Sequence, residues 1–418
     1  FHAGPAVIIS FLIAGIVCGA AVMCYAEFAS MIPVAGSAYT FTYTTVGEIM
    51  AWIIGWDLIL EMLMAGSVIS KYWGVYLNDF MRLMGWNANT NLTFGSFHID
   101  IAPIIIVAFF TTLLVFGTKI GARVDGAMTV LKIAIVFFVV IVGFFYVKAS
   151  NFTPFIPPSQ PASTVEGSSA VTGVMTQPLW QFATGMTPSV YGVPGILSGA
   201  ALVFFAFIGF DVVATASEET KNPHKNVPLG IGVGMLLIIV MYMLVAVVTT
   251  GMVSYADLAK QDSPSLATAF ELVGADWAAK IISFGIVLGL ATVVMVLLLG
   301  LTRIVFAMSR DGLLPRGLSK TGKHGTPAAL QIVVGAVVAL VAAFFDIGVL
   351  SDMVNIGTLS AFTLVAISIP IMRKKRPDLP RAFKMPGSPW IPILIAVANF
   401  WLMLNLSVLT WIRFVVWL

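Results

Sequence analysis

Long apolar segments follow one another along almost the whole chain and constrain its fold more than any other feature. About ten of them are long enough, or nearly so, to cross a hydrocarbon core of roughly 30 Å. They lie near residues 6–31, 48–70, 102–117, 126–147, 198–217, 229–251, 277–302, 328–345, 355–372 and 390–408. Backbone hydrogen bonds must close within each segment, and the segments lack the alternation of a lipid-facing barrel. The sequence therefore predicts an all-α, multi-pass protein of the lipid bilayer, with residues 1–418 as one transmembrane domain.

The charged residues are few, and their placement predicts an orientation. They make up 10% of the chain, whereas soluble domains carry about 25%. Roughly fifteen Lys and Arg residues fall in alternate loops on one side and about six on the other. The positive-inside rule makes the richer side cytoplasmic, so we expect both chain ends outside. The basic loops thus indicate orientation, and no nucleic-acid partner is expected.

The segment 198–221 looks like a membrane helix that is interrupted in the middle. An apolar run over 200–208 is followed by Gly209, which lowers helix stability by up to about 1 kcal/mol. Asp211 follows, and a carboxylate in hydrocarbon costs at least roughly 2.5 kcal/mol. Unwinding around 207–209 would free carbonyls that hold a cation and N–H groups that hold an anion, as an amino acid backbone requires. The alternative is a continuous core helix with one hydrogen-bonded Asp.

Three further charged residues lie inside predicted spans. Asp57 and Glu61 are four residues apart, hence on one helix face, and two close carboxylates disfavour joint ionisation. Glu61 is nearer the middle of its span, which favours a functional role over a structural one. Lys132 is surrounded by apolar residues, so burial would let it gain and lose a proton. Alternatively, it reaches back to the membrane interface.

The remaining features exclude more than they identify. Residues 148–197 form a predicted external loop rich in Ser, Thr, Pro and Gly, which is either a lid or disordered. The two cysteines are too few for a disulfide framework. We find no metal-ligand cluster, nucleophile–base set or phosphate loop in the sequence. We therefore expect no enzymatic activity, metal or cofactor.

Several motifs in order resemble the amino acid–polyamine–organocation superfamily and, within it, the cationic amino acid transporter family. They are CYAEFAS at 24–30, GSAYTFTY at 36–43, GWDLILE at 55–61, FFAFIGFD at 204–211, SEETKNPHKNVPLGI at 217–231, SRDGLLP at 309–315, NIGTLSAF at 355–362 and RPDLPRAFKMP at 376–386. The resemblance implies the LeuT-type fold of inverted repeats, here lacking the family's first helix and most of its twelfth. That agrees with the outside-to-outside orientation predicted from charge.

The resemblance also implies roles for individual residues. The unwound part of the family's sixth helix, where the substrate amine meets carbonyls, matches Phe207, Ile208, Gly209, Phe210 and Asp211. Glu61 matches a third-helix glutamate associated with transport. Lys132 matches a fifth-helix lysine that takes the place of a coupling sodium. Thr292 and Met295 lie where the eighth helix passes the substrate.

Together these features predict a secondary transporter of the plasma membrane. It would import a cationic or small neutral amino acid with a proton. Two alternatives remain open: an amino acid or polyamine exchanger without proton coupling, and a transport-dead amino acid sensor on the same scaffold.

Overall fold

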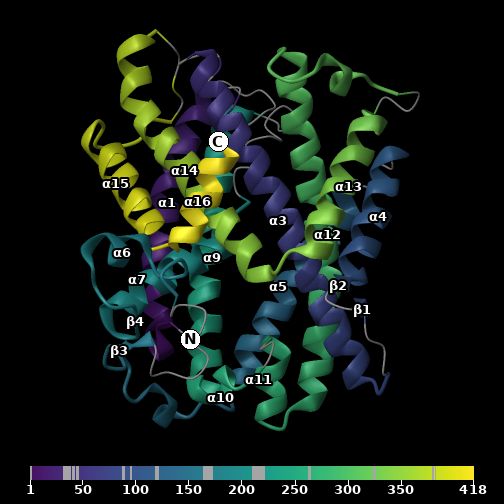
Figure 1. Cartoon of the computed structure of the whole chain (residues 1–418), viewed down its shortest axis with the longest axis vertical. Coiled ribbons are helices and arrows are strands. Elements are labelled where there is room, and N and C mark those ends of the chain that lie inside the picture. The colour runs from purple at the N-terminus through teal and green to yellow at the C-terminus, as the bar shows by residue number, and fades with distance from the viewer. Residues whose placement is uncertain are drawn as a thin grey trace.

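Helices that run side by side in one bundle make up most of the computed structural model (Figure 1). It describes residues 2–418 apart from 32–38, 40–42, 44–46, 87–89, 95–96, 118–121, 163–172, 210–221, 262–264, 323–325, 379–380 and 382. Within these residues, 6 helices are long and apolar enough to cross a membrane, and shorter apolar helices accompany them. The predominantly helical architecture agrees with the predicted fold class.

The elements follow the apolar segments of the sequence. The long helices are α1 (Val7–Met31), α3 (Glu48–Leu83), α5 (Ala122–Phe144), α9 (Pro223–Met252), α12 (Asp276–Arg310) and α14 (Ile347–Lys375). The shorter apolar helices are α4 (Ile101–Val115), α7 (Gly192–Val203), α13 (Ala328–Phe344), α15 (Trp390–Leu404) and α16 (Val408–Trp417). Three small helices, α6 (Leu179–Thr184), α10 (Tyr255–Ala259) and α11 (Leu266–Leu272), lie between them. Two antiparallel strand pairs join β1 (Asn91–Phe94) to β2 (Phe97–Asp100) and β3 (Gln160–Pro161) to β4 (Ser189–Val190).

Several helices extend beyond the apolar segments that predict them. α3 continues past residue 70 to Leu83, and α14 begins at Ile347 rather than near 355. Polar residues end an apolar segment of the sequence, but they need not end the helix. The free-energy cost of a polar side chain in a membrane applies inside the hydrocarbon region. The described part of segment 198–217 ends at Gly209.

The segment 148–197, predicted as an external loop, has regular structure among its described residues. It contains α6 and the short sheet of β3 and β4. The Leu179 amide donates to the Leu406 carbonyl (2.9 Å), and the Val408 amide donates to the Gln177 carbonyl (3.1 Å). These bonds hold the loop against the connection between α15 and α16.

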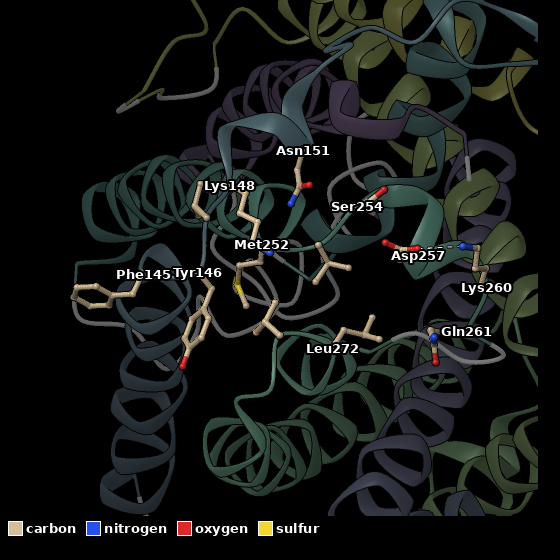
Figure 2. Close-up of a pocket in the computed structure, with 13 residues that line it drawn as sticks. Phe145, Tyr146, Lys148, Asn151, Met252, Ser254, Asp257, Lys260, Gln261 and Leu272 are labelled. Carbon is tan, nitrogen blue, oxygen red and sulfur yellow. Dashed lines mark hydrogen bonds and ion pairs between the residues drawn. The ribbon is translucent and has the colours of Figure 1, made fainter.

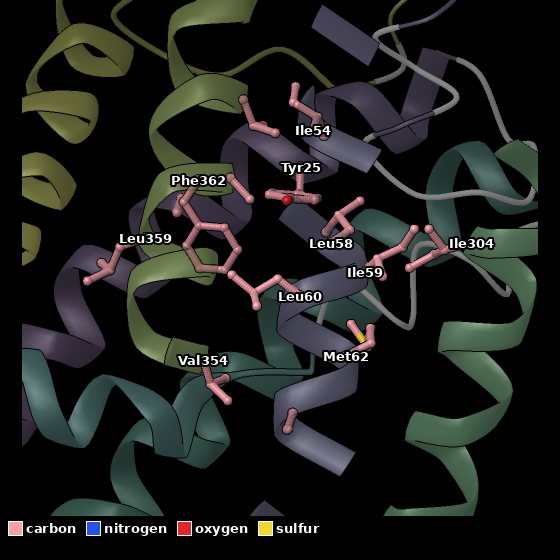
Figure 3. Close-up of a cluster of buried hydrophobic side chains, with 14 of the residues drawn as sticks. Tyr25, Ile54, Leu58, Ile59, Leu60, Met62, Ile304, Val354, Leu359 and Phe362 are labelled. Carbon is pink, nitrogen blue, oxygen red and sulfur yellow. The ribbon is translucent and has the colours of Figure 1, made fainter. Parts of the chain in front are cut away.

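The largest core cluster draws its buried side chains from most of the helices, above all from α14 and α3. α3 packs along both α12 and α14, while α1 packs along α9 and α7. The Phe362 ring of α14 meets Tyr25 of α1 edge-on at 5.4 Å between centroids (Figure 3). It also meets Phe204, just after α7, at 5.7 Å. One aromatic side chain therefore fixes α1 and the end of α7 to α14.

A buried carboxylate joins the ends of α1 and α14 on the predicted cytoplasmic side. Glu27 is fully buried. Its two oxygens accept from Arg373 Nε (2.9 Å) and Nη2 (2.7 Å), and Oε2 also accepts from the Met385 amide (2.7 Å). Arg381 Nε lies 3.6 Å from Oε1. A planar guanidinium that matches both carboxylate oxygens gives a strong, directional ion pair.

We expect Glu27→Gln to destabilise the folded protein. The substitution keeps the shape but leaves the facing arginines without their counter-charge, which costs about 3 kcal/mol when such a pair is buried. Thermal unfolding in detergent should show a clearly lower midpoint. Asp378→Asn is the matched control, because Asp378 and its partner Arg376 are both exposed and exposed pairs contribute about 0–1 kcal/mol. Equal midpoints for the two variants would contradict a stabilising role for Glu27.

Candidate functional site

The α-helix of α7 stops inside the segment where the sequence predicts an interruption. It ends at Val203, and Phe204–Phe207 continue as a 3-10 helix. Ile208 is extended, with φ −71° and ψ 145°, and Gly209 has φ +116°. Side chains other than glycine rarely adopt that φ. The helix therefore ends within the described part of the segment, and the predicted second half-helix after Gly209 lies outside the described residues.

Side chains from three other helices donate hydrogen bonds to the backbone carbonyls at the end of α7. Asn355 Nδ2 of α14 donates to the Leu202 carbonyl (3.3 Å). Tyr242 Oη of α9 donates to the Ala206 carbonyl (2.6 Å), and Cys18 Sγ of α1 lies 3.9 Å from the Phe207 carbonyl. A carbonyl left unpaired in a membrane would cost several kcal/mol. These contacts therefore offset the free-energy cost of ending the helix at this depth.

A cavity of about 590 Å³ opens beside the break, and we call it the central cavity. Residues 205–209 form one side of it, and α3, α5, α9 and α12 form the others. Much of the lining is aliphatic, as in Ile69, Ile231, Ile238 and Val293. Its size is in the range of small-molecule sites, about 300–1,000 Å³.

The structure brings Lys132 to the same cavity as the broken helix. Lys132, on α5, is among the lining residues together with Phe207, Ile208 and Gly209. Its stem packs against α12, where a methyl group on Gly289 would lie 3.2 Å from Lys132 Cγ. The absence of a side chain at residue 289 gives the lysine room to cross between the two helices.

Neither of the two carboxylates predicted on α3 is among the residues that line the central cavity. Glu61 is fully buried, and Ala65 and Ile69, one and two turns further along the same helix face, line the cavity. Asp57 instead faces α14, where its Oδ2 accepts from Ser360 Oγ. Asp57 therefore serves the packing of α3 on α14.

The other predicted site residues are not part of the described cavity wall. Thr292 Oγ1 donates to the Gly289 carbonyl (2.9 Å), and Met295 packs on the hydrophobic core. Their neighbours Leu290, Val293 and Val296 line the cavity instead. Phe210 and Asp211 lie outside the described residues.

Sequence reasoning missed Tyr242 and Asn355. Tyr242 lines the central cavity, and its ring meets Phe207 edge-on at 5.1 Å. A tyrosine in an apolar span must find an acceptor for its hydroxyl, and that requirement could have marked it. Asn355 could have been marked in the same way, as an amide inside the NIGTLSAF motif.

A second cavity lies near the ends of α5 and α9 and is bordered by α10 (Figure 2). It shares no residue with the central cavity. Of its charged residues Lys148, Asp257 and Lys260, the last two pair with each other at 3.2 Å, and Asn151 Nδ2 donates to the Gly251 carbonyl. Residues 205–209 at the helix end line the central cavity and not this one, so the central cavity is the better candidate for a substrate site.

Two family motifs meet on the predicted cytoplasmic side. Tyr39 Oη donates to Asp311 Oδ2 at 2.9 Å, which joins the 36–43 segment to the end of α12. Burial, followed by this hydrogen bond to a carboxylate, raises the pKa of Tyr39 above its ordinary value. The hydroxyl therefore stays protonated and remains a donor at neutral pH.

Comparisons with known proteins match nearly the whole chain to membrane transporters. The family described as "Amino acid permease" matches residues 2–416. A branched-chain amino acid permease of Bacillus subtilis strain 168 is 42% identical over 424 residues, which cover 100% of this chain and 84% of the relative. A methylthioribose transporter of the same strain is 38% identical, with 100% and 84% covered. The mitochondrial cationic amino acid transporter 3 of Arabidopsis thaliana is 37% identical, with 89% and 57% covered.

We expect Gly209→Leu to reduce ligand binding at the central cavity at least about tenfold, a loss of about 1.4 kcal/mol. A leucine would strain the backbone at φ +116°, and its side chain would extend into open space beside the break. Ligand-induced thermal stabilisation would measure the loss. Gly232→Leu is the control, because Gly232 also has open space around it but does not line the cavity. An undiminished thermal shift in Gly209→Leu would separate the break from ligand binding.

Glu61→Gln should lower substrate uptake at least about tenfold, equivalent to about 1.4 kcal/mol in the transport step. It replaces a buried carboxyl group, one turn from the cavity-lining Ala65, while keeping the side-chain shape. Uptake per inserted protein in proteoliposomes is the measurement. Glu48→Gln, at the exposed start of α3, should transport normally. Normal uptake in both variants would assign Glu61 to structure.

Proposed function

This chain belongs to the amino acid permease family, and from that premise we propose that it imports neutral aliphatic amino acids across the plasma membrane together with protons. It is a multi-pass membrane protein of a transporter family rather than an enzyme, and the family implies a LeuT-like fold. The observation that carries the proposal is the central cavity, in which a broken helix, an aliphatic wall and one lysine meet.

The broken helix supplies the groups that an amino acid backbone needs. The carbonyls of Ala206 and Phe207 each meet one protein donor, and a carbonyl oxygen has a second lone pair. A substrate ammonium binds there by adding a hydrogen bond rather than by displacing Tyr242. The negative end of the short helix dipole also favours a cation at this point.

The wall of the cavity favours a neutral aliphatic side chain over a cationic one. The described residues that line it include no Asp or Glu, and many are Ile, Leu or Val. Transfer of an aliphatic side chain into such a wall contributes about 0.8 kcal/mol per buried CH₂, whereas an unpaired guanidinium or ammonium would pay a desolvation cost. The branched-chain specificity in the name of the 42% identical relative fits this chemistry.

We assign to the Lys132 side chain the binding and release of the proton that is transported with the substrate. The ammonium form would lie between α5 and α12 beside the break and would hold these elements together, and loss of the proton would release them. Its packing against Gly289 supports this role, because the stem already spans the gap to α12. Binding of substrate and proton would then stabilise the same arrangement of helices.

Uptake by the full-length protein in proteoliposomes tests the function. Labelled leucine, arginine and methylthioribose are supplied in turn, each under an inward proton gradient or an inward sodium gradient. We expect accumulation of leucine under the proton gradient alone. Preferential uptake of arginine would mean that the substrate is a cationic amino acid. Preferential uptake of methylthioribose would mean that the chain shares the substrate named for its 38% identical relative. Dependence on internal amino acid, without either gradient, would identify an exchanger.

Lys132→Ala should abolish proton-driven accumulation of leucine and preserve exchange of internal for external leucine. Exchange needs no net proton movement, whereas concentrative uptake requires the titrating group. The ratio of the two activities is the measurement, so a variant that merely fails to insert is recognised by the loss of both. Lys320→Ala, at an exposed position, is the control. Concentrative uptake by Lys132→Ala would move the proton to another group.

A further inference from the structure

A third cavity, of about 410 Å³, lies on the predicted external side between α14 and α16. We call it the α14–α16 cavity. It is bounded by the start of α14, the first turns of α16, the connection that precedes α16, and α7. It shares no lining residue with the central cavity, so the two are distinct.

Opposite charges face this cavity without neutralising each other. Asp352 of α14 and Arg413 of α16 both line it. Asp352 Oδ2 accepts from Thr410 Oγ1 at 3.1 Å, which fixes the carboxylate toward α16. The ion pairs found among the described residues do not include Asp352 with Arg413, so their charged atoms are more than 4.0 Å apart. They are near enough for Arg413 to act on Asp352 electrostatically.

An unpaired acceptor lies in the same wall. Asn405 is 4% exposed and lines the cavity. Its Nδ2 donates to the Trp401 carbonyl at 2.8 Å, whereas its Oδ1 is buried without a hydrogen-bond partner. A buried acceptor in that state carries an unfavourable desolvation energy, because its bonds to water have not been replaced. A ligand with an N–H donor would recover this energy.

The other polar residues in the wall add no second positive charge to that of Arg413. Asp346, at the start of α14, adds a second carboxylate to the wall. His2 also lines the cavity, and burial lowers its pKa to about 4, so its imidazole is neutral at physiological pH. Ser198 supplies a hydroxyl. The cavity therefore offers acceptors and negative charge near Asp352 and Asn405 and a fixed positive charge at Arg413.

We infer that the α14–α16 cavity is a second amino acid-binding site. The α-ammonium binds Asp352 and Asn405 Oδ1, and the α-carboxylate binds Arg413. Because the two charged groups are not in contact with each other, each can bind one charge of a zwitterion, and the volume is in the range of small-molecule sites. The inference rests on the proposed function in one respect, namely that the ligand is the transported amino acid. Occupancy there would hold substrate at the external face before it enters the central cavity.

Equilibrium binding of labelled leucine to the purified full-length protein tests this site. We expect two leucine molecules per chain in the wild type and one in either Asp352→Asn or Gly209→Leu. The double variant should bind none. Arg413→Gln should act like Asp352→Asn, and it provides a second reading if one of these variants is poorly folded. Asp257→Asn, on the same predicted side but in the cavity bordered by α10, should retain both sites.

Competition by half-ligands identifies the chemistry in Gly209→Leu, where only the second site remains. Isoamylamine and 4-methylpentanoate each carry one of the two charges of leucine, and each should compete at least about tenfold less well than leucine. Equal competition by 4-methylpentanoate would mean a carboxylate site and would overturn the zwitterion assignment.

The outcomes separate this inference from the proposed function. Wild-type uptake of leucine with a single binding site, unaffected by Asp352→Asn, would reject the second site and leave the function in place. Absence of both uptake and binding of leucine in the wild type would reject both proposals.

Discussion

The structure depends on how a membrane protein pairs backbone carbonyls where a helix stops. In hydrocarbon there is no water to take the place of a missing helical hydrogen bond. The interruption after Val203 is possible because Asn355, Tyr242 and Cys18 reach the exposed carbonyls from α14, α9 and α1. The break is consequently a property of four helices rather than of one.

The same contacts explain why the core and the candidate site cannot be separated. Phe204 and Phe207 belong to the interrupted segment, and their rings pack on Phe362 of α14 and Tyr242 of α9. Asn355 and Phe362 lie two turns apart on α14, so one helix supplies both a hydrogen bond and an aromatic contact to the segment. Movement of the segment would therefore be felt by α9 and α14 together. Such shared contacts are what couples a binding site to helix movement.

Much of the architecture could be predicted from the sequence because lipid imposes strong local rules. The length of the apolar segments predicted the helices, and Gly209, followed two residues later by Asp211, predicted the end of the helix in 198–217. Both signals act within a single segment and need no knowledge of its neighbours. The pairing of Asp57 with Ser360 could not be foreseen, because it depends on which face of α3 meets α14. The lining positions Val293 and Val296 were missed for the same reason. Periodicity shows that a helix exists, whereas the direction in which it faces is set by its neighbours.

The length of α3 has a mechanical consequence. Its 36 residues extend about 54 Å, well beyond a hydrocarbon core of about 30 Å. Near its far end, Arg82 binds Glu271 of α11 through two hydrogen bonds of 2.9 and 2.8 Å, and near its beginning Trp56 stacks on Trp417 at 4.8 Å between centroids. α12 is nearly as long and packs beside it. The two helices form a stiff pair, held near both ends of α3, beside which the much shorter α7 stops at Val203.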